Sequence, residues 1–161
     1  MATITKKKVL TLPGFGGVPY GNNTVREFTF ETNSSGVYVD SDTATAVGNG
    51  DKVRVGVLSA GMRLHDALAI VSDAFRTSST AKIGFEYVDG VDSTAVPQDD
   101  DYFFASLALD AAGRTRAANT AVRPVTLPKD AYLILTNGGG NAQNVAGQLD
   151  LLVFGEMVGP A

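Results

Sequence analysis

Short segments in which apolar and polar residues alternate constrain the fold of this chain most strongly. In KVRVGVL (52–58), Val53, Val55 and Val57 recur at every second position, which is the period of a β-strand with one buried face. Turns rich in Gly, Asn and Ser separate this segment from others like it. The other strands that alternation and apolar character predict are residues 27–32, 37–40, 81–90, 131–137 and 148–158.

This arrangement of short strands selects a fold class. Hydrophobic residues make up 44% of the chain and charged residues 19%, as in a globular domain and unlike a disordered one. No repeated strand–helix–strand unit is visible, which argues against a parallel α/β sheet. The pattern predicts an all-β fold with a β-sandwich or jelly-roll-like body.

Three further segments fit more than one structure. Residues 62–75 carry apolar side chains at helical spacing, but they also alternate and follow strand 52–58 through a short Gly-containing turn, so we predict a strand. Residues 102–113 fit either a helical turn or two or an irregular strand, and two prolines in 115–130 favour short edge strands and turns. The residues expected on one face of the first segment are Leu64, Asp66, Leu68 and Ile70.

The first 26 residues differ from the rest in charge and composition. They hold four basic residues and no acidic one, so the remainder of this chain, whose net charge is −4, carries −8. Glycine and proline in GFGGVPYG (14–21) prevent regular structure. We predict an extended N-terminal arm over 1–26 and a sandwich domain over 27–161. A basic arm on an acidic body favours an acidic protein surface as partner and argues against direct binding of nucleic acid.

The glycines of the arm do not fit a phosphate-binding loop. Such a loop follows a strand and opens a helix, so that backbone N–H groups face the anion. Here no strong strand precedes the glycines, Pro19 stands where a helix would begin, and the lysine expected after the last glycine is missing. We therefore predict no nucleotide and no other cofactor.

The side chains of the arm suit contact with a protein surface instead. Apolar side chains along an extended segment are exposed to water unless another surface covers them, and burial contributes about 25 cal/mol per Å². A partner, or the chain's own sandwich, provides that surface, and both alternatives stay open. The predicted partner-binding residues are Lys6, Lys7, Lys8, Val9, Leu10, Leu12, Phe15 and Tyr20.

The sequence contains few residues that could carry out catalysis. There is no cysteine, and His65 is the only histidine. Neighbouring residues of a strand point to opposite faces, so His65 and Asp66 are expected to diverge, and no G-x-S-x-G nucleophile motif is present. We predict an ordinary surface or edge histidine and a protein that is not an enzyme.

Two polar clusters are candidate binding sites. QDDDY (98–102) offers carboxylates of the kind that bind hard cations, but it lacks the spacing of a calcium loop. We predict a solvated acidic loop and no metal, with a basic group of a neighbouring subunit as the alternative occupant. GGGNAQN (138–144) is expected to be a solvent-exposed loop. The weaker candidates for polar contacts with a partner there are Asn137, Asn141, Gln143 and Asn144.

Membrane insertion and export are not indicated. The longest apolar runs, such as LDLLVF (149–154), are far too short to span a bilayer. No apolar stretch of signal-peptide length follows the N-terminal lysines. We expect a protein that is made in the cytoplasm and used without export machinery.

Several phrases of the C-terminal two thirds carry a family resemblance. They are KVRVGVLSAGMRLHDALAIVSDAF, DDDYFFASLALDAAGRTRA, RPVTLPKDAYLILTNGGG and AGQLDLLVFGEM. Over roughly residues 50–157, the pattern and strand spacing resemble the capsid decoration (cement) proteins of long-tailed bacteriophages, including phages that attack flagellated bacteria. The resemblance lies in this pattern rather than in one diagnostic motif.

The resemblance implies a structural virion protein. Such proteins sit on the outer surface of the phage head, often as homotrimers and in some cases as dimers, and clamp neighbouring major capsid (coat) subunits. An extended N-terminal arm suits that task, because it can cross a subunit boundary and add a strand or apolar contacts there. The alternatives are a head-fibre, tail-tip or baseplate domain that recognises a receptor or carbohydrate, and, less favoured, a polysaccharide hydrolase.

Overall fold

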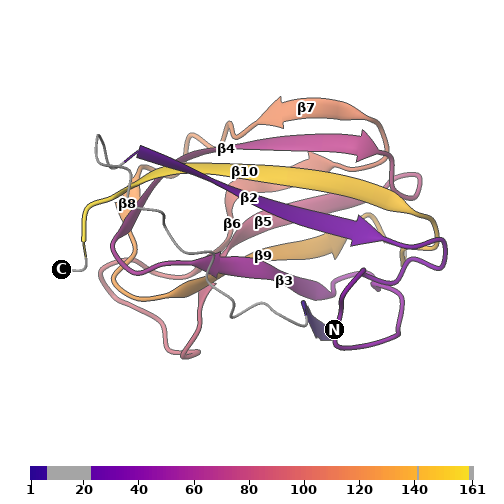
Figure 1. Cartoon of the computed structure of the whole chain (residues 1–161), viewed down its shortest axis with the longest axis horizontal. Coiled ribbons are helices and arrows are strands. Elements are labelled where there is room, and N and C mark those ends of the chain that lie inside the picture. Colours follow the sequence, from indigo (N-terminus) through magenta and orange to yellow (C-terminus); the bar gives the residue numbers. More distant parts are fainter. Residues whose placement is uncertain (7–22, 141, 160–161) are drawn as a thin grey trace.

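The computed structural model describes residues 1–6, 23–140 and 142–159 of the chain, and in this part the fold is all-β. Two five-stranded sheets pack face to face as the two layers of the fold (Figure 1). Sheet I has the strand order β1-β3-β9-β5-β6, and sheet II has the order β2-β10-β4-β7, with β8 pairing with β4. The strands are β1 (Thr3–Thr5), β2 (Asn23–Thr32), β3 (Lys52–Leu58), β4 (Met62–Asp73), β5 (Thr80–Tyr87), β6 (Asp99–Ala108), β7 (Gly113–Arg116), β8 (Val125–Thr126), β9 (Ala131–Gly138) and β10 (Gly147–Met157).

The predicted β-sandwich is therefore confirmed, and the predicted strand over residues 62–75 is confirmed for residues 62–73. The prolines of 115–130 leave only the short strands β7 and β8, as expected. No helix among the described residues is long and apolar enough to cross a membrane.

The core fills the space between the two sheets. Each sheet turns a row of apolar side chains inward, and these form one continuous cluster with aromatic rings from both layers. Phe30 is 2% exposed, and its ring lies 5.2 Å from that of Tyr38 and 5.3 Å from that of Phe75, measured between centroids. This contact joins β2, the loop after it and the end of β4 into one unit.

A β-bulge in β4 changes which side chains face the core. Phe154 of β10 lies opposite Asp66, and the next residue, Gly155, lies opposite Leu64, so His65 is an extra residue. Leu64 points inward before the bulge, whereas Asp66 points outward after it. The expectation that Leu64 and Asp66 share a face is therefore wrong, because an extra residue shifts the alternation by one. The residues that face outward after the bulge are Asp66, Leu68 and Ile70.

A second bulge, in β3, does the same to the valines of 52–58. Arg54 pairs with Ile134 and Gly56 with Leu133, which leaves Val55 as the extra residue. Val53 and Val55 join the core between the sheets, but Val57 joins a separate buried cluster. The expectation of one shared face thus fails at Val57, for the same physical reason. The members of this separate cluster are Val57, Tyr132 and Ile134.

Two other segments differ from the sequence expectation. Residues 37–40 form only isolated bridges, in which Tyr38 pairs with Thr32 and Val37 with Ala46. The acidic residues at 99–101, expected in a loop, are the first residues of β6. β6 also resolves the alternatives for 102–113 in favour of an irregular strand, since it bulges against β5.

The first residues of the chain belong to sheet I. β1 pairs in parallel with β3, and Ile4 is buried in the core. The backbone N–H of Ala2 donates to Asp51 Oδ1 at 2.6 Å, and the N–H of Lys6 donates to the carbonyl of Arg54 at 3.3 Å. These contacts fix residues 2–6 on the sandwich, and β2 begins at Asn23.

Truncation of Phe30 tests the core contact. Phe30→Ala removes a ring that is buried between two others, so we expect a loss of about 3–5 kcal/mol in the free energy of unfolding, measured by denaturant titration. Val91→Ala is the control, because Val91 is 62% exposed and such a surface change costs within about 0.5 kcal/mol. Equal stabilities of the two variants would contradict the assigned core.

Candidate functional site

Of the predicted partner-binding residues, the structure describes only Lys6. Its backbone is fixed on sheet I, where it forms an isolated bridge with Ser41. The role of the arm therefore stays a prediction. The residues that lie outside the described part of the chain are Lys7, Lys8, Val9, Leu10, Leu12, Phe15 and Tyr20.

The bulge in β4 brings His65 and Asp66 to the same outer side of sheet II, where each lies near a different side chain. His65 Nε2 lies 3.6 Å from Glu156 Oε1, and Asp66 accepts a hydrogen bond from Arg116 Nε. The expectation that the two side chains diverge is wrong, because the bulge cancels the alternation.

Asp99, Asp100 and Asp101 converge because β6 bulges strongly against β5. Phe85 pairs with Asp99 and Ile83 with Phe104, so four residues of β6 lie opposite Gly84 alone. Gly84 permits this approach: a Cβ there would lie 2.0 Å from the carbonyl oxygen of Asp99. One carboxylate oxygen from each aspartate lies within 4.8 Å of the others.

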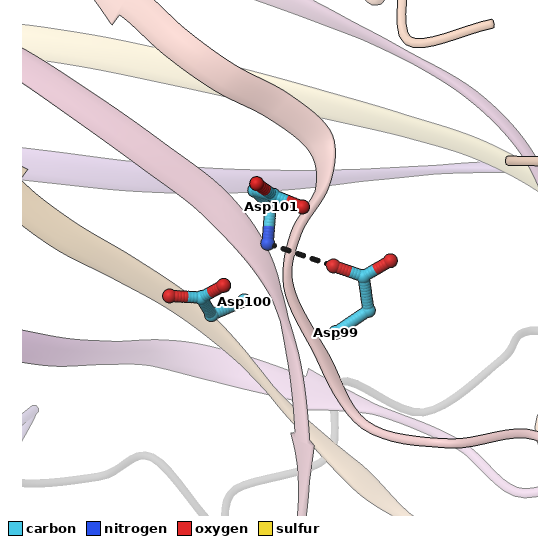
Figure 2. A group of neighbouring side chains, drawn as sticks. All are labelled: Asp99, Asp100 and Asp101. Carbon is cyan, nitrogen blue, oxygen red and sulfur yellow. Dashed lines mark hydrogen bonds between the residues drawn. The ribbon is translucent and has the colours of Figure 1, made fainter. Parts of the chain in front are cut away.

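The acidic cluster is partly neutralised within the chain. Lys82 Nζ lies 3.4 Å from Asp100 Oδ2 and 3.9 Å from Asp101 Oδ2. Asp99 Oδ1 accepts a hydrogen bond of 3.0 Å from the backbone N–H of Asp101 (Figure 2). Burial, and then the charges of Asp101 and Asp100, raise the pKa of Asp99, although that hydrogen bond opposes the shift. The carboxylate oxygens could act as metal ligands, but the same arrangement is typical of a surface lysine that pairs with aspartates.

A second charged group lies on sheet I beside Tyr132, a member of the separate cluster of Val57, Tyr132 and Ile134. Glu86 Oε2 lies 2.6 Å from Lys52 Nζ, and its Oε1 lies 2.7 Å from Arg54 Nε. The guanidinium of Arg54 stacks over the ring of Tyr132 at 4.4 Å. Burial alone raises the pKa of Glu86, but hydrogen bonds from Lys52 and Arg54 outweigh it and lower the pKa below its ordinary value.

The amide side chains near the Gly-rich loop act inside the protein. Asn137 and Gln143 are each 1% exposed. Gln143 Nε2 donates to Ser79 Oγ and to Asn137 Oδ1, both at 2.9 Å, while Asn137 Nδ2 donates to the carbonyl of Gly48 at 2.8 Å. The suggestion that these two side chains contact a partner is wrong, because they connect loops of this chain to one another.

The outer face of sheet II is the broad surface that sequence reasoning missed. Leu152 of β10 lies beside Leu68 of β4, and Phe154 lies beside Val25 of β2. Val25 is 52% exposed, and the other three are half-buried. The signal was present in LDLLVF, where apolar residues fall at both odd and even positions, as in a strand with apolar side chains on both faces.

Comparison with known proteins rests on structure alone. No protein-family model matches the sequence, and no curated protein matches it. A chain in the capsid of Ralstonia phage GP4 superimposes with a TM-score of 0.63 and 15% sequence identity, over 99% of this chain and 100% of that one. A chain of the cyanophage Pam1 capsid asymmetric unit gives 0.52 and 13%, over 92% of each chain.

The fold is shared with chains of two phage capsids. At these sequence identities the likeness establishes the architecture and does not establish the function. The match extends over nearly the whole length of both chains.

A substitution in the acidic cluster tests its electrostatics. Because the folded state raises the pKa of Asp99, its ionised form costs stability above that pKa, and the cost disappears as pH falls through it. Asp99→Asn keeps an oxygen that accepts from the Asp101 N–H. We expect this variant to be more stable than wild type at neutral pH and to lose that advantage in acid, measured by urea titration at several pH values.

Asp73→Asn is the matched control, since Asp73 lies exposed at the end of β4. Its effect on stability is expected within about 0.5 kcal/mol. An Asp99→Asn variant that is less stable than wild type at neutral pH would show that the carboxylate is held by a favourable interaction, such as a bound cation.

Proposed function

We propose that this chain is a structural virion protein that binds the outer surface of a phage head and cements neighbouring coat subunits. The observation that carries the proposal is the near full-length match to a chain of the Ralstonia phage GP4 capsid. A second match, to a chain of the cyanophage Pam1 capsid, supports it. The sequence resemblance to decoration proteins of long-tailed phages points to the same role, and a non-enzymatic, stabilising protein follows from it.

The proposed mechanism divides the work between an arm and a body. The sandwich provides a rigid body that makes contacts with other copies, with a homotrimer favoured over a dimer. The segment that contains Lys7, Lys8 and the apolar residues after them reaches onto the coat, where lysines meet acidic groups and apolar side chains are buried. Many copies on one shell make individually weak contacts effective through avidity.

Binding to heads tests the proposal directly. Purified chain is added to phage heads that lack it, and cryo-EM locates the added density. We expect the chain on the outer shell and, because it holds neighbouring coat subunits together, an increase in the temperature at which heads release DNA. Density at the tail or a fibre, or no binding to heads, would overturn the cement role and favour the receptor-binding alternative.

The lysines of the arm predict a salt-dependent affinity. Charge contacts at an exposed surface are screened over about 10 Å at ~0.1 M salt, so binding to heads is expected to weaken as salt rises. Lys7→Ala/Lys8→Ala should lower the affinity at low salt and flatten its salt dependence, measured by co-sedimentation. Lys6 is left intact because its backbone belongs to sheet I.

Lys82→Ala/Lys129→Ala gives the same change in net charge on the body and serves as the control. Both lysines form ion pairs within the chain, with Asp100 and Asp89 respectively. Equal losses of affinity in the two double variants, or binding of wild type that does not change with salt, would count against a role for the arm lysines.

A further inference from the structure

On the outer face of sheet II, side chains line up in rows that cross β2, β10, β4 and β7. One row reads Glu27 on β2, Leu152 on β10, Leu68 on β4 and Arg116 on β7, as the strand register places them. The adjacent row ends in Arg114, which lies beside Ile70. The face thus has an acidic edge, a mostly apolar centre that also contains Asp150 and Gln148 of β10, and a basic edge.

The apolar centre is unusual for a sheet that faces water. In an antiparallel sandwich the outer positions are ordinarily polar, so that only the inner face is buried. Here β10 places Leu152 and Phe154 outward, while Leu149, Leu151 and Val153 fill the core. Exposed apolar patches with a polar rim mark interaction sites, and the rim here has opposite charges on its two sides.

The charges at the edges are available to another molecule. β2 and β7 are the two edges of the sheet, and Figure 1 shows them on opposite sides of β10 and β4. Glu27, Glu31 and Arg114 are exposed, and none of them forms an ion pair with another described residue. Arg116 pairs with Asp66 but remains 72% exposed at its side chain, with its guanidinium 5.9 Å from the Phe154 ring.

We propose that a second copy of this chain covers the outer face of sheet II, with the acidic edge of one copy against the basic edge of the next. One face carries both an acidic edge and a basic edge. A second copy of the same chain can therefore place its basic edge against the acidic edge of the first copy, and its acidic edge against the basic one. The proposal rests on the self-assembly in the proposed function and assigns the surface that makes it.

The order of charges also determines the orientation of the symmetry axis that relates neighbouring copies. If this axis is parallel to the strands, β2 of one copy lies against β7 of its neighbour, both in a dimer and in a trimer. A two-fold axis across the strands would instead place Glu27 opposite Glu27, and like charges facing each other are unfavourable. The strands of neighbouring copies should therefore run along the symmetry axis.

The polar groups in the centre of the face are already paired, which lowers the cost of covering them. Asp150 accepts a hydrogen bond from Thr29 Oγ1 at 2.8 Å and one from Gln148 Nε2 at 3.1 Å. Asp66 is held by Arg116. Burial of a polar group costs little when its hydrogen bonds are made within the chain, so the contact needs few polar partners from the neighbour.

Two valines of matched exposure provide the first test. Val25 lies on the proposed contact face and Val91 lies off it, and both are largely exposed, so neither substitution should disturb folding. Analytical ultracentrifugation of the full chain is expected to show an oligomer for wild type and for Val91→Lys. The dissociation constant of the Val25→Lys oligomer should be at least tenfold higher, while the circular dichroism spectrum of the folded chain stays unchanged.

Charge reversal tests the pairing of the edges. The acidic-edge variant Glu27→Arg and the basic-edge variant Arg114→Glu should each weaken association, and Arg116 is left unchanged because it holds Asp66. The chain that carries both changes should regain association, because its edges have exchanged charge. Failure to regain it, with the fold intact, would overturn the proposed pairing, and so would a wild-type chain that is monomeric at every concentration.

Binding to heads separates this inference from the proposed function. A monomeric chain that binds heads, and whose Val25→Lys variant does not, would assign the face to the coat and reject the second copy. An oligomer that dissociates as expected but binds no heads would support the contact face and reject the cement role.

Discussion

Close packing between the inner faces of the two sheets is the constraint on which the rest of the structure depends. Sheet II presses the ring of Phe28 against β3 at Gly56, where a Cβ would lie 2.3 Å from the ring. A side chain there would force the sheets apart locally, since packed interiors leave no room for an added methyl group. This contact sets how closely β2 approaches sheet I, and β2 in turn pairs with β10, which carries the centre of the outer face.

The bulges in β3 and β4 allow this close packing while they change which side chains point outward. Each inserts one residue and thereby lets a strand keep apolar side chains inward while it changes what it shows outside. In β4 this places His65 and Asp66 together beside β10, and in β3 it places Val57 in the cluster with Tyr132 and Ile134, apart from the core between the sheets. The surface chemistry of the protein is thus set by register shifts within its strands.

Sequence reasoning predicted the all-β sandwich and most strands, because alternation and turn residues are local signals. It did not find the bulges, since an extra residue such as Val55 leaves no local mark in an otherwise regular pattern. It also assigned Asp99 to a loop, because three aspartates are poor strand formers and only pairing with β5 explains their place. The outer face of sheet II depends on register between strands far apart in sequence, such as Leu68 beside Leu152, which one strand's pattern does not contain.

The buried amides at the loops have a consequence for how the protein opens. Gln143 and Asn137 connect the segments around Gly48, Ser79 and the β9–β10 connection by hydrogen bonds that water does not reach. Opening any one of these segments would leave buried donors or acceptors in the others without partners, at about 1–3 kcal/mol each. The loops should therefore exchange their amide hydrogens together and at rates close to those of the strands they join, rather than fraying one by one.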